Sequence, residues 1–250
     1  MRNREFCHLL TITLLVQWPV CSMLLRAQAS PPERTEAKQQ TNWESSHSRP
    51  ALSRLVLALR DFDDANGHLP HRAIRSEEGT PLLSWRVAIL PFIGQADLYK
   101  KFRLNEPWDS DHNRALISSM PAVFKTDIDR DALPNVPVGK TQTLLPIMDG
   151  SLWHGDDPMP PRITQVKDGT AYTMGLLIAP PGQAVTWTRP VDFQIKNPHE
   201  IFGDRDHCPI ATLDGGFFQI SKLATAEEIS SLLTNDAGDV VQWNKLLQAK

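Results

Sequence analysis

The clearest periodic pattern in the chain is a helical stripe of apolar residues that begins just after residue 50. Five residues recur at the spacing i, i+3, i+4, i+7, which is typical of the buried face of an amphipathic helix. They are Leu52, Leu55, Val56, Leu59 and Phe62. Pro50 suits the first turn of a helix, and Asn66-Gly67 suits its end. The pattern therefore predicts a helix between these signals that packs one face against a core.

After this helix, His68-Leu69-Pro70 is expected to lead into a loop through Glu78-Gly79. Shorter helical patterns follow, and prolines separate them. Ser84 can cap a second helix that Pro91 bends or ends, and a further helical run is expected over residues 93–102. A third helix is expected over residues 111–120, where Asp109 or Ser110 can accept hydrogen bonds from its first amides. The chain has twenty prolines and thirteen glycines, so short elements joined by rigid loops are expected.

The second half of the chain has the pattern of strands, expected over residues 143–148, 171–179, 184–188, 209–213 and 217–221. Asp214-Gly215 between the last two predicts a hairpin with a type I′ turn. Thr225 and Glu228 have the spacing of a capping box, which predicts a closing helix that ends near Gly238. Helices followed by an antiparallel sheet indicate an α+β fold, with the N-terminal helices packed on the sheet.

The first 29 residues have the form of an export signal. Arg2 and Arg4 precede an apolar run from Phe6 to Leu25, and Ala27-Gln28-Ala29 suits a signal peptidase. A retained membrane anchor is the alternative, because the run has about the ~20 residues that a bilayer span needs. Residues 30–49 are polar and predict a linker, so residues 50–250 are expected to form a single α+β domain.

Charge and cysteine content limit the possible functions. The formal net charge is −3 without a basic stripe, so nucleic acid is not an expected partner. Cleavage after residue 29 would leave Cys208 as the one cysteine, which excludes an internal disulfide. The expected location is the periplasm, cell envelope or extracellular space, with membrane contact only through an uncleaved N-terminal segment.

Several residue groups have some of the features of functional sites. Residues 127–131 carry alternate aspartates, but Ala132 replaces the glycine that a calcium loop needs. Residues 199–207 contain two histidines and three acidic residues without a zinc motif. Asp109, His112 and a nearby serine, Ser84 or Ser110, lack the ordered triad of a hydrolase. No catalytic, cofactor or metal site is therefore assigned, and whether either loop binds a metal stays open.

The tryptophans are numerous enough to line a groove, although core packing is the expected role. They are Trp85, Trp108, Trp153 and Trp187. Arg86 is expected to stack on an aromatic ring or to pair with a carboxylate such as Asp109.

Taken in order, several short motifs resemble the bacterial domain of unknown function 1559 family, also described as solute-binding-like and pilin-like. The resemblance extends roughly from Leu52 to Val241, and its motifs include the end of the first predicted helix. The structural motif residues are Trp85, Arg86, Pro91, Pro107, Trp108, Asp109, Asn113, Asp214 and Gly215. The resemblance implies export and a helix packed on an antiparallel sheet, and it implies no catalytic residues. Pilus-type processing is not expected, because the prepilin signal of many relatives is missing here.

Together these features predict an exported, non-enzymatic, pilin-like interaction or structural domain whose partners are other envelope or extracellular proteins. A solute-binding module of the cell envelope is the alternative. A metal-dependent hydrolase is a third, weaker hypothesis. A broad exposed apolar face would favour the interaction domain, and a concave pocket with convergent polar groups would favour the binding module.

Overall fold

The computed structural model describes residues 48–125, 137–154, 160–236, 238 and 241–247. The predicted signal, most of the predicted linker and the aspartates of residues 127–131 lie outside these residues. Among the described helices, none combines the length and apolar character needed to cross a bilayer.

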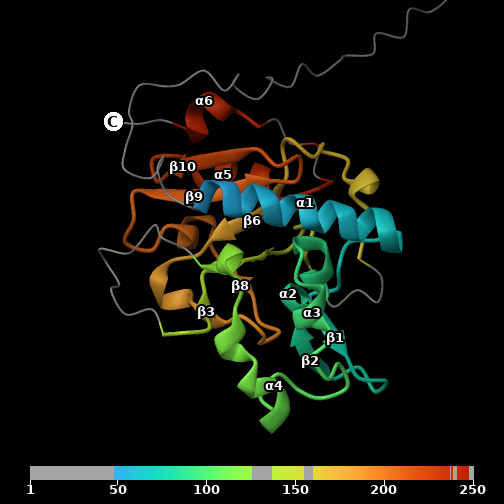
Figure 1. The fold of residues 1–250 in the computed structure, drawn as a ribbon. Helices are drawn as coiled ribbons and strands as arrows, with labels where there is room; N and C mark the ends of the chain where they lie inside the picture. Colours follow the sequence, from blue (N-terminus) through green and yellow to red (C-terminus); the bar gives the residue numbers. More distant parts are fainter. Residues whose placement is uncertain (1–47, 126–136, 155–159, 237, 239–240, 248–250) are drawn as a thin grey trace, which may run out of the picture.

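A four-stranded antiparallel sheet occupies the centre of the fold (Figure 1). Its strands are β4 (Thr143–Leu144), β6 (Met174–Ile178), β9 (His207–Thr212) and β10 (Phe217–Ser221), in the spatial order β10-β9-β6-β4. All five residues of β6 are buried, because helices and loops cover both faces of the sheet.

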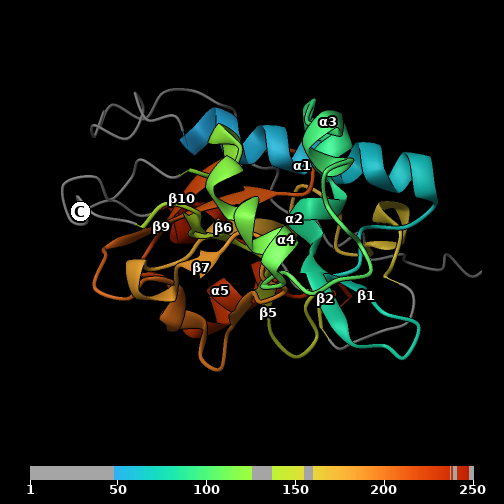
Figure 2. The same cartoon turned by 60° about the horizontal axis from the view of Figure 1, so that its bottom comes forward.

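Helix α1 (Ser48–Asn66) covers one face of the sheet, and helix α5 (Ala226–Leu233) lies on the other side (Figure 2). Helix α6 (Trp243–Leu246) contributes Trp243 and Leu246 to the same apolar cluster as α5. Leu55 and Leu59 of α1 share one apolar cluster with Leu176 of β6. Ile229 of α5 belongs to a second cluster with Leu177, the next residue of β6. Successive side chains of a strand point to opposite faces, so β6 joins the two apolar clusters.

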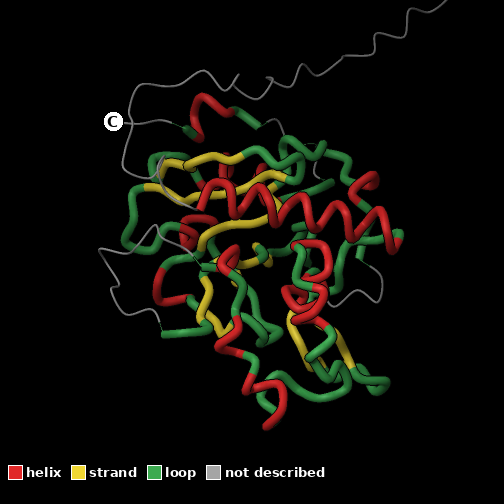
Figure 3. The backbone as a smooth tube through the Cα atoms, viewed as in Figure 1, coloured by secondary structure: helices red, strands yellow, loops and turns green. Residues whose placement is uncertain are grey.

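Short helices, 3-10 turns and small sheets fill the space beside α1 (Figure 3). The helices are α2 (Trp85–Ala88), α3 (Ala96–Tyr99) and α4 (Asp111–Ala115). Two antiparallel pairs are formed by β1 (Ala73–Arg75) with β2 (Pro81–Ser84) and by β3 (Lys140–Thr141) with β7 (Val185–Thr186). The remaining pair, β5 (Pro146–Ile147) with β8 (Phe193–Gln194), is parallel.

The α+β prediction is confirmed, as are its two main helices. Helix α1 begins two residues before Pro50 and ends at Asn66, and Gly67 follows with φ of 80°. The capping box of α5 is present, because Thr225 Oγ1 accepts from Glu228 N and Glu228 Oε2 accepts from Thr225 N. Helix α5 ends at Leu233, well before Gly238, because the chain leaves the helix at Thr234, whose backbone is extended.

Three predictions for the segments between α1 and residue 120 were wrong. The segment after α1 was expected to be a loop, yet it forms the β1–β2 pair. The helix expected over residues 93–102 is reduced to α3, because Gly94 ends the preceding 3-10 turn in a left-handed conformation (φ 75°). The helix expected over residues 111–120 ends at Ala115, and a 3-10 turn follows.

The hairpin between β9 and β10 is confirmed, but its turn differs from the prediction. Gly215 N donates to Thr212 O, Thr212 N donates to Gly216 O, and Gly215 has φ of 89°. This pattern fits a three-residue loop with a glycine bulge rather than a two-residue type I′ turn. The Asp214 carboxylate holds the turn by accepting from Gly216 N at 2.9 Å and from Thr212 Oγ1 at 2.6 Å.

Candidate functional site

The motif residue Arg86 lies in a buried polar cluster, with its side chain 0% exposed. Its Nη1 donates to Ser84 Oγ at 2.7 Å, while Nε and Nη2 both donate to Thr143 O. Nη2 also pairs with Asp192 Oδ1 at 2.6 Å. The guanidinium carbon stands 4.8 Å from the centre of the Trp85 ring, so the predicted aromatic stacking is confirmed.

Asp192 is the carboxylate of this cluster, which corrects the suggested pairing of Arg86 with Asp109. Besides Arg86, its Oδ1 accepts from Trp85 Nε1 at 3.1 Å and from Leu145 N at 3.0 Å. Asp109 is exposed on the loop before α4. Sequence proximity favoured Asp109, whereas the tertiary fold brings in a residue 106 positions away.

Desolvation dominates the electrostatics of this pair. Burial raises the pKa of Asp192, and the charge of Arg86 and the three donated hydrogen bonds oppose that shift. Burial likewise lowers the pKa of Arg86. The cluster is closed to solutes, so we assign it a structural role: it joins the α2 segment to β4 and to the loop before β8.

The motif from Pro107 to Asn113 also has a structural role. The Asn113 amide Nδ2 donates to three carbonyls, those of Arg103, Glu106 and Pro107, and its Oδ1 accepts from Arg103 N. One buried side chain thus organises the whole loop before α4. Ser110 caps α4 by accepting from Asn113 N, as predicted.

The tryptophans divide into core residues and one half-buried residue. Trp85 and Trp187 are completely buried, and Trp153 is 3% exposed. Trp108 is half-buried and lies under the Arg189 guanidinium, at 5.6 Å from ring centre to carbon. Core packing is confirmed for the three buried rings. Pro91 occupies the start of the 3-10 turn Leu90–Ile93, which places it outside any site.

The hydrolase candidates do not form a triad in the described part of the chain. Ser84 Oγ is occupied within the buried cluster, Ser110 is a helix cap, and the His112 ring is 2.8 Å from Lys101 O. Cys208 is buried and free, and burial raises the pKa of its thiol to about 12. A thiol in that environment is not a nucleophile at neutral pH.

The acidic and histidine-rich residues 199–207 do not converge either. The His199 ring is 2.9 Å from Ala224 O, and Glu200 accepts from Lys196 N. Among the described residues, no three histidine, cysteine or acidic side chains are grouped as a metal would require.

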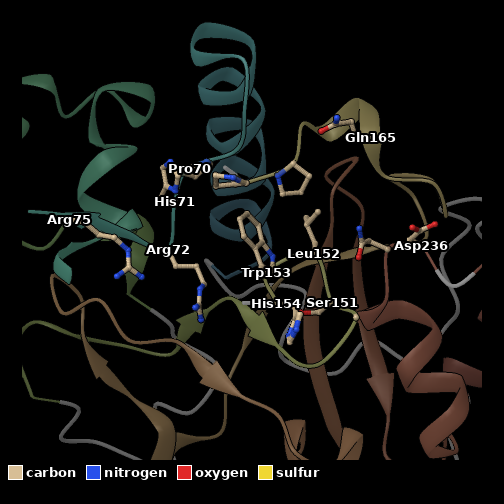
Figure 4. Close-up of a pocket in the computed structure, with 14 residues that line it drawn as sticks. Pro70, His71, Arg72, Arg75, Ser151, Leu152, Trp153, His154, Gln165 and Asp236 are labelled. Atoms are coloured by element: carbon tan, nitrogen blue, oxygen red, sulfur yellow. The ribbon is translucent and has the colours of Figure 1, made fainter. Parts of the chain in front are cut away.

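The feature most suited to binding is a pocket of about 590 Å³ beside β1 (Figure 4). Four segments meet there: residues 70–75 after α1, residues 150–154 after β5, residues 160–165, and residues 235–236 after α5. Its volume falls in the range of about 300–1,000 Å³ that is common for small-molecule sites. It is open to solvent on one side.

One side of the pocket carries basic side chains, which we call the basic wall: His71, Arg72, Arg75 and His154. Arg72 and Arg75 are three positions apart, a spacing that puts side chains on opposite faces of a regular strand. Both line the pocket here. Arg72 stands in a bend before β1, and the register of β1 with β2 shifts between Ile74 and Arg75. Such irregularities redirect side chains and are common beside binding sites.

Hydrogen bonds hold the other segments of the pocket to the body of the fold. Trp153 Nε1 donates to Gly175 O of β6, and Ser151 forms an isolated bridge with Thr234 after α5. Leu69 N donates to Pro161 O, which ties the chain after α1 to the 160–165 segment. The pocket is therefore lined by segments whose backbones are fixed by long-range contacts.

Comparison with known protein families assigns this chain to one of them. The family model described as protein of unknown function (DUF1559), with the short name SBP_bac_10, matches residues 48–201, which is more than half of the chain. The chain belongs to the DUF1559 family. The match ends before β9, so Asp214-Gly215 and the last helices lie beyond it, although the sequence resemblance was expected to reach Val241. Searches of curated proteins and of solved structures gave no significant match.

Sequence reasoning did not find the pocket of this DUF1559 member. Arg72 and Arg75 stand in a stretch that was expected to be a loop, and they match no short motif. Two prolines at 160 and 161 and the pair Asn235-Asp236 look like ordinary turns. The one available signal was the density of His and Arg in residues 68–75, at four of eight positions.

Proposed function

We propose that this chain is an exported, non-enzymatic binding module of the cell envelope that holds a small solute in the pocket beside β1. The observation that carries the proposal is the pocket itself, where four separate segments converge around a basic wall. This function is the alternative considered from the sequence, and the short name of the family model, SBP_bac_10, is consistent with it.

The distribution of exposed apolar residues also favours a binding module over an interaction domain. Among the described residues, four large apolar side chains are more than about a third exposed. They are Leu57, Val138, Val191 and Leu223. They belong to four different segments, which is ordinary for a soluble surface and differs from the broad apolar face expected of a docking domain.

A pilin-like interaction domain is the second candidate, and one observation favours it. The long helix α1 lies along an antiparallel sheet, at the N-terminal side of the described fold (Figure 1). In this candidate, the partners are other envelope proteins and the pocket has no ligand.

A retention experiment tests the proposal. The full chain would be equilibrated with a small-molecule extract of its own cells, separated from unbound solutes, and analysed by mass spectrometry. Asn235→Trp fills the pocket, and Asn105→Trp is the matched control at an exposed asparagine outside it. We expect a solute retained by the natural chain and by the control but lost from Asn235→Trp. Equal retention by all three variants, or none by any, would overturn the binding function.

Export requires its own measurement. We expect the chain recovered from the envelope or medium to begin at Ser30. A chain found only in the cytosol with Met1 intact would contradict this part of the proposal.

A further inference from the structure

We infer that Asp149-Gly150 is a site of spontaneous covalent modification, at which the folded chain converts aspartate to isoaspartate through a cyclic succinimide. Glycine follows aspartate or asparagine at three other places, Asn66-Gly67, Asp168-Gly169 and Asp214-Gly215. A glycine has no side chain to obstruct the attack of its own backbone nitrogen, so the sequence alone makes all four dipeptides candidates. The structure separates them. This inference goes beyond the proposed function and does not depend on it.

The reaction needs a side-chain carbonyl carbon that can move and a backbone nitrogen that is free to attack it. The Gly150 nitrogen bonds to Cγ of Asp149, and its proton leaves with the hydroxyl of the protonated carboxyl as water. Water then opens the cyclic imide. Opening between the nitrogen and Cγ restores aspartate, whereas opening between the nitrogen and the main-chain carbonyl carbon gives isoaspartate. The atoms balance without an oxidant, a reductant or another protein.

Both groups are available at Asp149-Gly150. The side chain of Asp149 is fully exposed, and its described contact is with His154 Nδ1, at 3.3 Å from Oδ1. Exposed pairs of this kind restrain a side chain little. Ser151 N donates to Met148 O at 3.0 Å and Gly150 has φ of 77°, which fits a type II turn centred on Asp149-Gly150. That hydrogen bond leaves out the central peptide, and Gly150 N has no acceptor in the described part of the chain.

The carboxylates of the other two aspartate-glycine dipeptides are held in place. Asp168 is 3% exposed, and its Oδ1 accepts from Gly238 N at 2.9 Å. Asp214 Oδ1 accepts from two groups of the hairpin turn, and the nitrogen of Gly215 donates to Thr212 O. Because these hydrogen bonds must break before the nitrogen and the carboxyl carbon can meet, both sites are protected in the folded chain.

The end of α1 protects Asn66-Gly67. Gly67 N donates to Asp63 O at 2.8 Å, and Asn66 Nδ2 donates to Phe62 O at 2.8 Å. The attacking nitrogen and the amide group that would leave as ammonia are therefore both hydrogen-bonded to the helix. An unfolded chain lacks these bonds, so this protection depends on the fold.

Isomerisation at Asp149 would change the backbone beside the pocket. In isoaspartate the main chain runs through Cβ and Cγ, which lengthens the turn by one atom. Gly150 and Ser151 line the pocket (Figure 4), and Ser151 also forms the bridge with Thr234. A longer turn cannot keep both this bridge and the hydrogen bond from Ser151 N to Met148 O in their present geometry.

Peptide mapping of the folded full chain during prolonged incubation in mild acid tests this inference. Electron-transfer fragmentation distinguishes isoaspartate from aspartate in each peptide. We expect isoaspartate to accumulate at Asp149 at least about tenfold faster than at Asp168 or Asp214, because those sites must first lose hydrogen bonds. In concentrated urea the three sites should react at similar rates. No isoaspartate at Asp149 in the folded chain, or equal rates at the three folded sites, would overturn the inference.

Two variants of the same residue sharpen the test. Asp149→Glu keeps the charge, but its longer side chain disfavours ring closure, so the modification should disappear. Asp149→Asn places an asparagine-glycine pair in the exposed turn, and Asn66-Gly67 is its matched control in the same molecule. We expect the variant to release ammonia at position 149 at least about tenfold faster than at Asn66.

Thermal melting of both variants checks that they are folded. A modification at this turn that persists in Asp149→Glu would assign the reaction to another residue. Equal rates at the two asparagine-glycine pairs of folded Asp149→Asn would show that the turn gives the nitrogen no special access. Either result would overturn the inference.

Discussion

Arg86 lies close in the sequence to Arg72 and Arg75, but the surroundings of Arg86 in the fold are the opposite of theirs. Arg86 is fully buried and makes hydrogen bonds to Ser84, Thr143 and Asp192. Arg72 and Arg75, on the preceding segment, line an open pocket. The residue type is the same, but Arg86 is enclosed together with the carboxylate of Asp192, whereas Arg72 and Arg75 line a pocket that is open to solvent. Only Arg72 and Arg75 can take part in binding.

The difference has a simple structural cause. Arg86 is in the helix turn that follows Ser84, where β4 and the loop before β8 close over it. Arg72 and Arg75 flank the start of β1, which pairs only with β2 in a two-stranded sheet. An arginine in the interior of the fold thus forms a buried ion pair, whereas arginines beside the small β1–β2 sheet line the pocket.

The largest expected loss of stability follows from a change in the buried pair of Arg86 and Asp192. Asp192→Ala would leave Arg86 as an unpaired buried charge and remove the acceptor for Trp85 Nε1 and Leu145 N. We expect a loss of about 3–5 kcal/mol in the free energy of unfolding, measured by urea titration. The control Asp109→Ala, on an exposed carboxylate, should change it by less than about 0.5 kcal/mol. Similar losses in both variants would remove the distinction between the two aspartates.

The second prediction concerns the pair as a unit. Arg86→Met/Asp192→Leu removes both charges, so it avoids the penalty of one unpaired buried ion. In a double-mutant cycle, we expect the double variant to lose about 2 kcal/mol less free energy of unfolding than the summed losses of Arg86→Met and Asp192→Leu. Additive losses would show that the ion pair itself contributes nothing beyond its separate hydrogen bonds.

The third prediction addresses the helix that precedes the Asn235-Asp236 side of the pocket. Thr225→Ala removes the cap of α5 and should cost about 1 kcal/mol in the free energy of unfolding.

The same capping box should make stability depend on pH. The hydrogen bond from Thr225 N holds the pKa of Glu228 below its ordinary value of 4.5. The folded-state pKa is lowered, so this contribution is complete above about pH 4.5 and is lost as the pH falls through the folded-state pKa. The advantage of the natural chain over Glu228→Gln should therefore shrink in acid. An advantage that stays constant between neutral pH and pH 3 would contradict the assignment.

The smallest expected effect on stability belongs to the basic wall. Arg72→Gln and Arg75→Gln should each change the free energy of unfolding by about 0.5 kcal/mol or less, because both side chains are at least partly exposed and substitutions at such positions usually have small effects. A loss as large as that of Asp192→Ala would show that the wall is structural, and the comparison of the two arginine groups would fail.

Local signals in the sequence predicted the elements whose determinants are close together in the chain. The apolar stripe of α1, the capping box of α5 and the hairpin of β9 and β10 all depend on residues within a few positions of one another. The β1–β2 pair was missed because its strands are short and its apolar residues do not alternate regularly. The turn at Asp214-Gly215 was assigned the wrong type because Leu213 also belongs to the loop, which the hydrogen bond from Thr212 N to Gly216 O closes at three residues.

The candidate site depended on contacts that no local pattern reveals. Asp109 was suggested as the carboxylate partner of Arg86 because it is close in the sequence, but in the folded chain Arg86 pairs with Asp192. The pocket is lined by residues from 70 to 236, which become neighbours only when α1, β5 and α5 pack around the sheet.

The sequence by itself determined the α+β character of this chain, its first helix and its membership of the DUF1559 family, because these follow from short-range periodicity and motif order. Only the tertiary structure decided which arginines are buried and which face a pocket. The physical reason is that burial and charge pairing depend on the distances between segments, and those distances are set by packing across the whole chain.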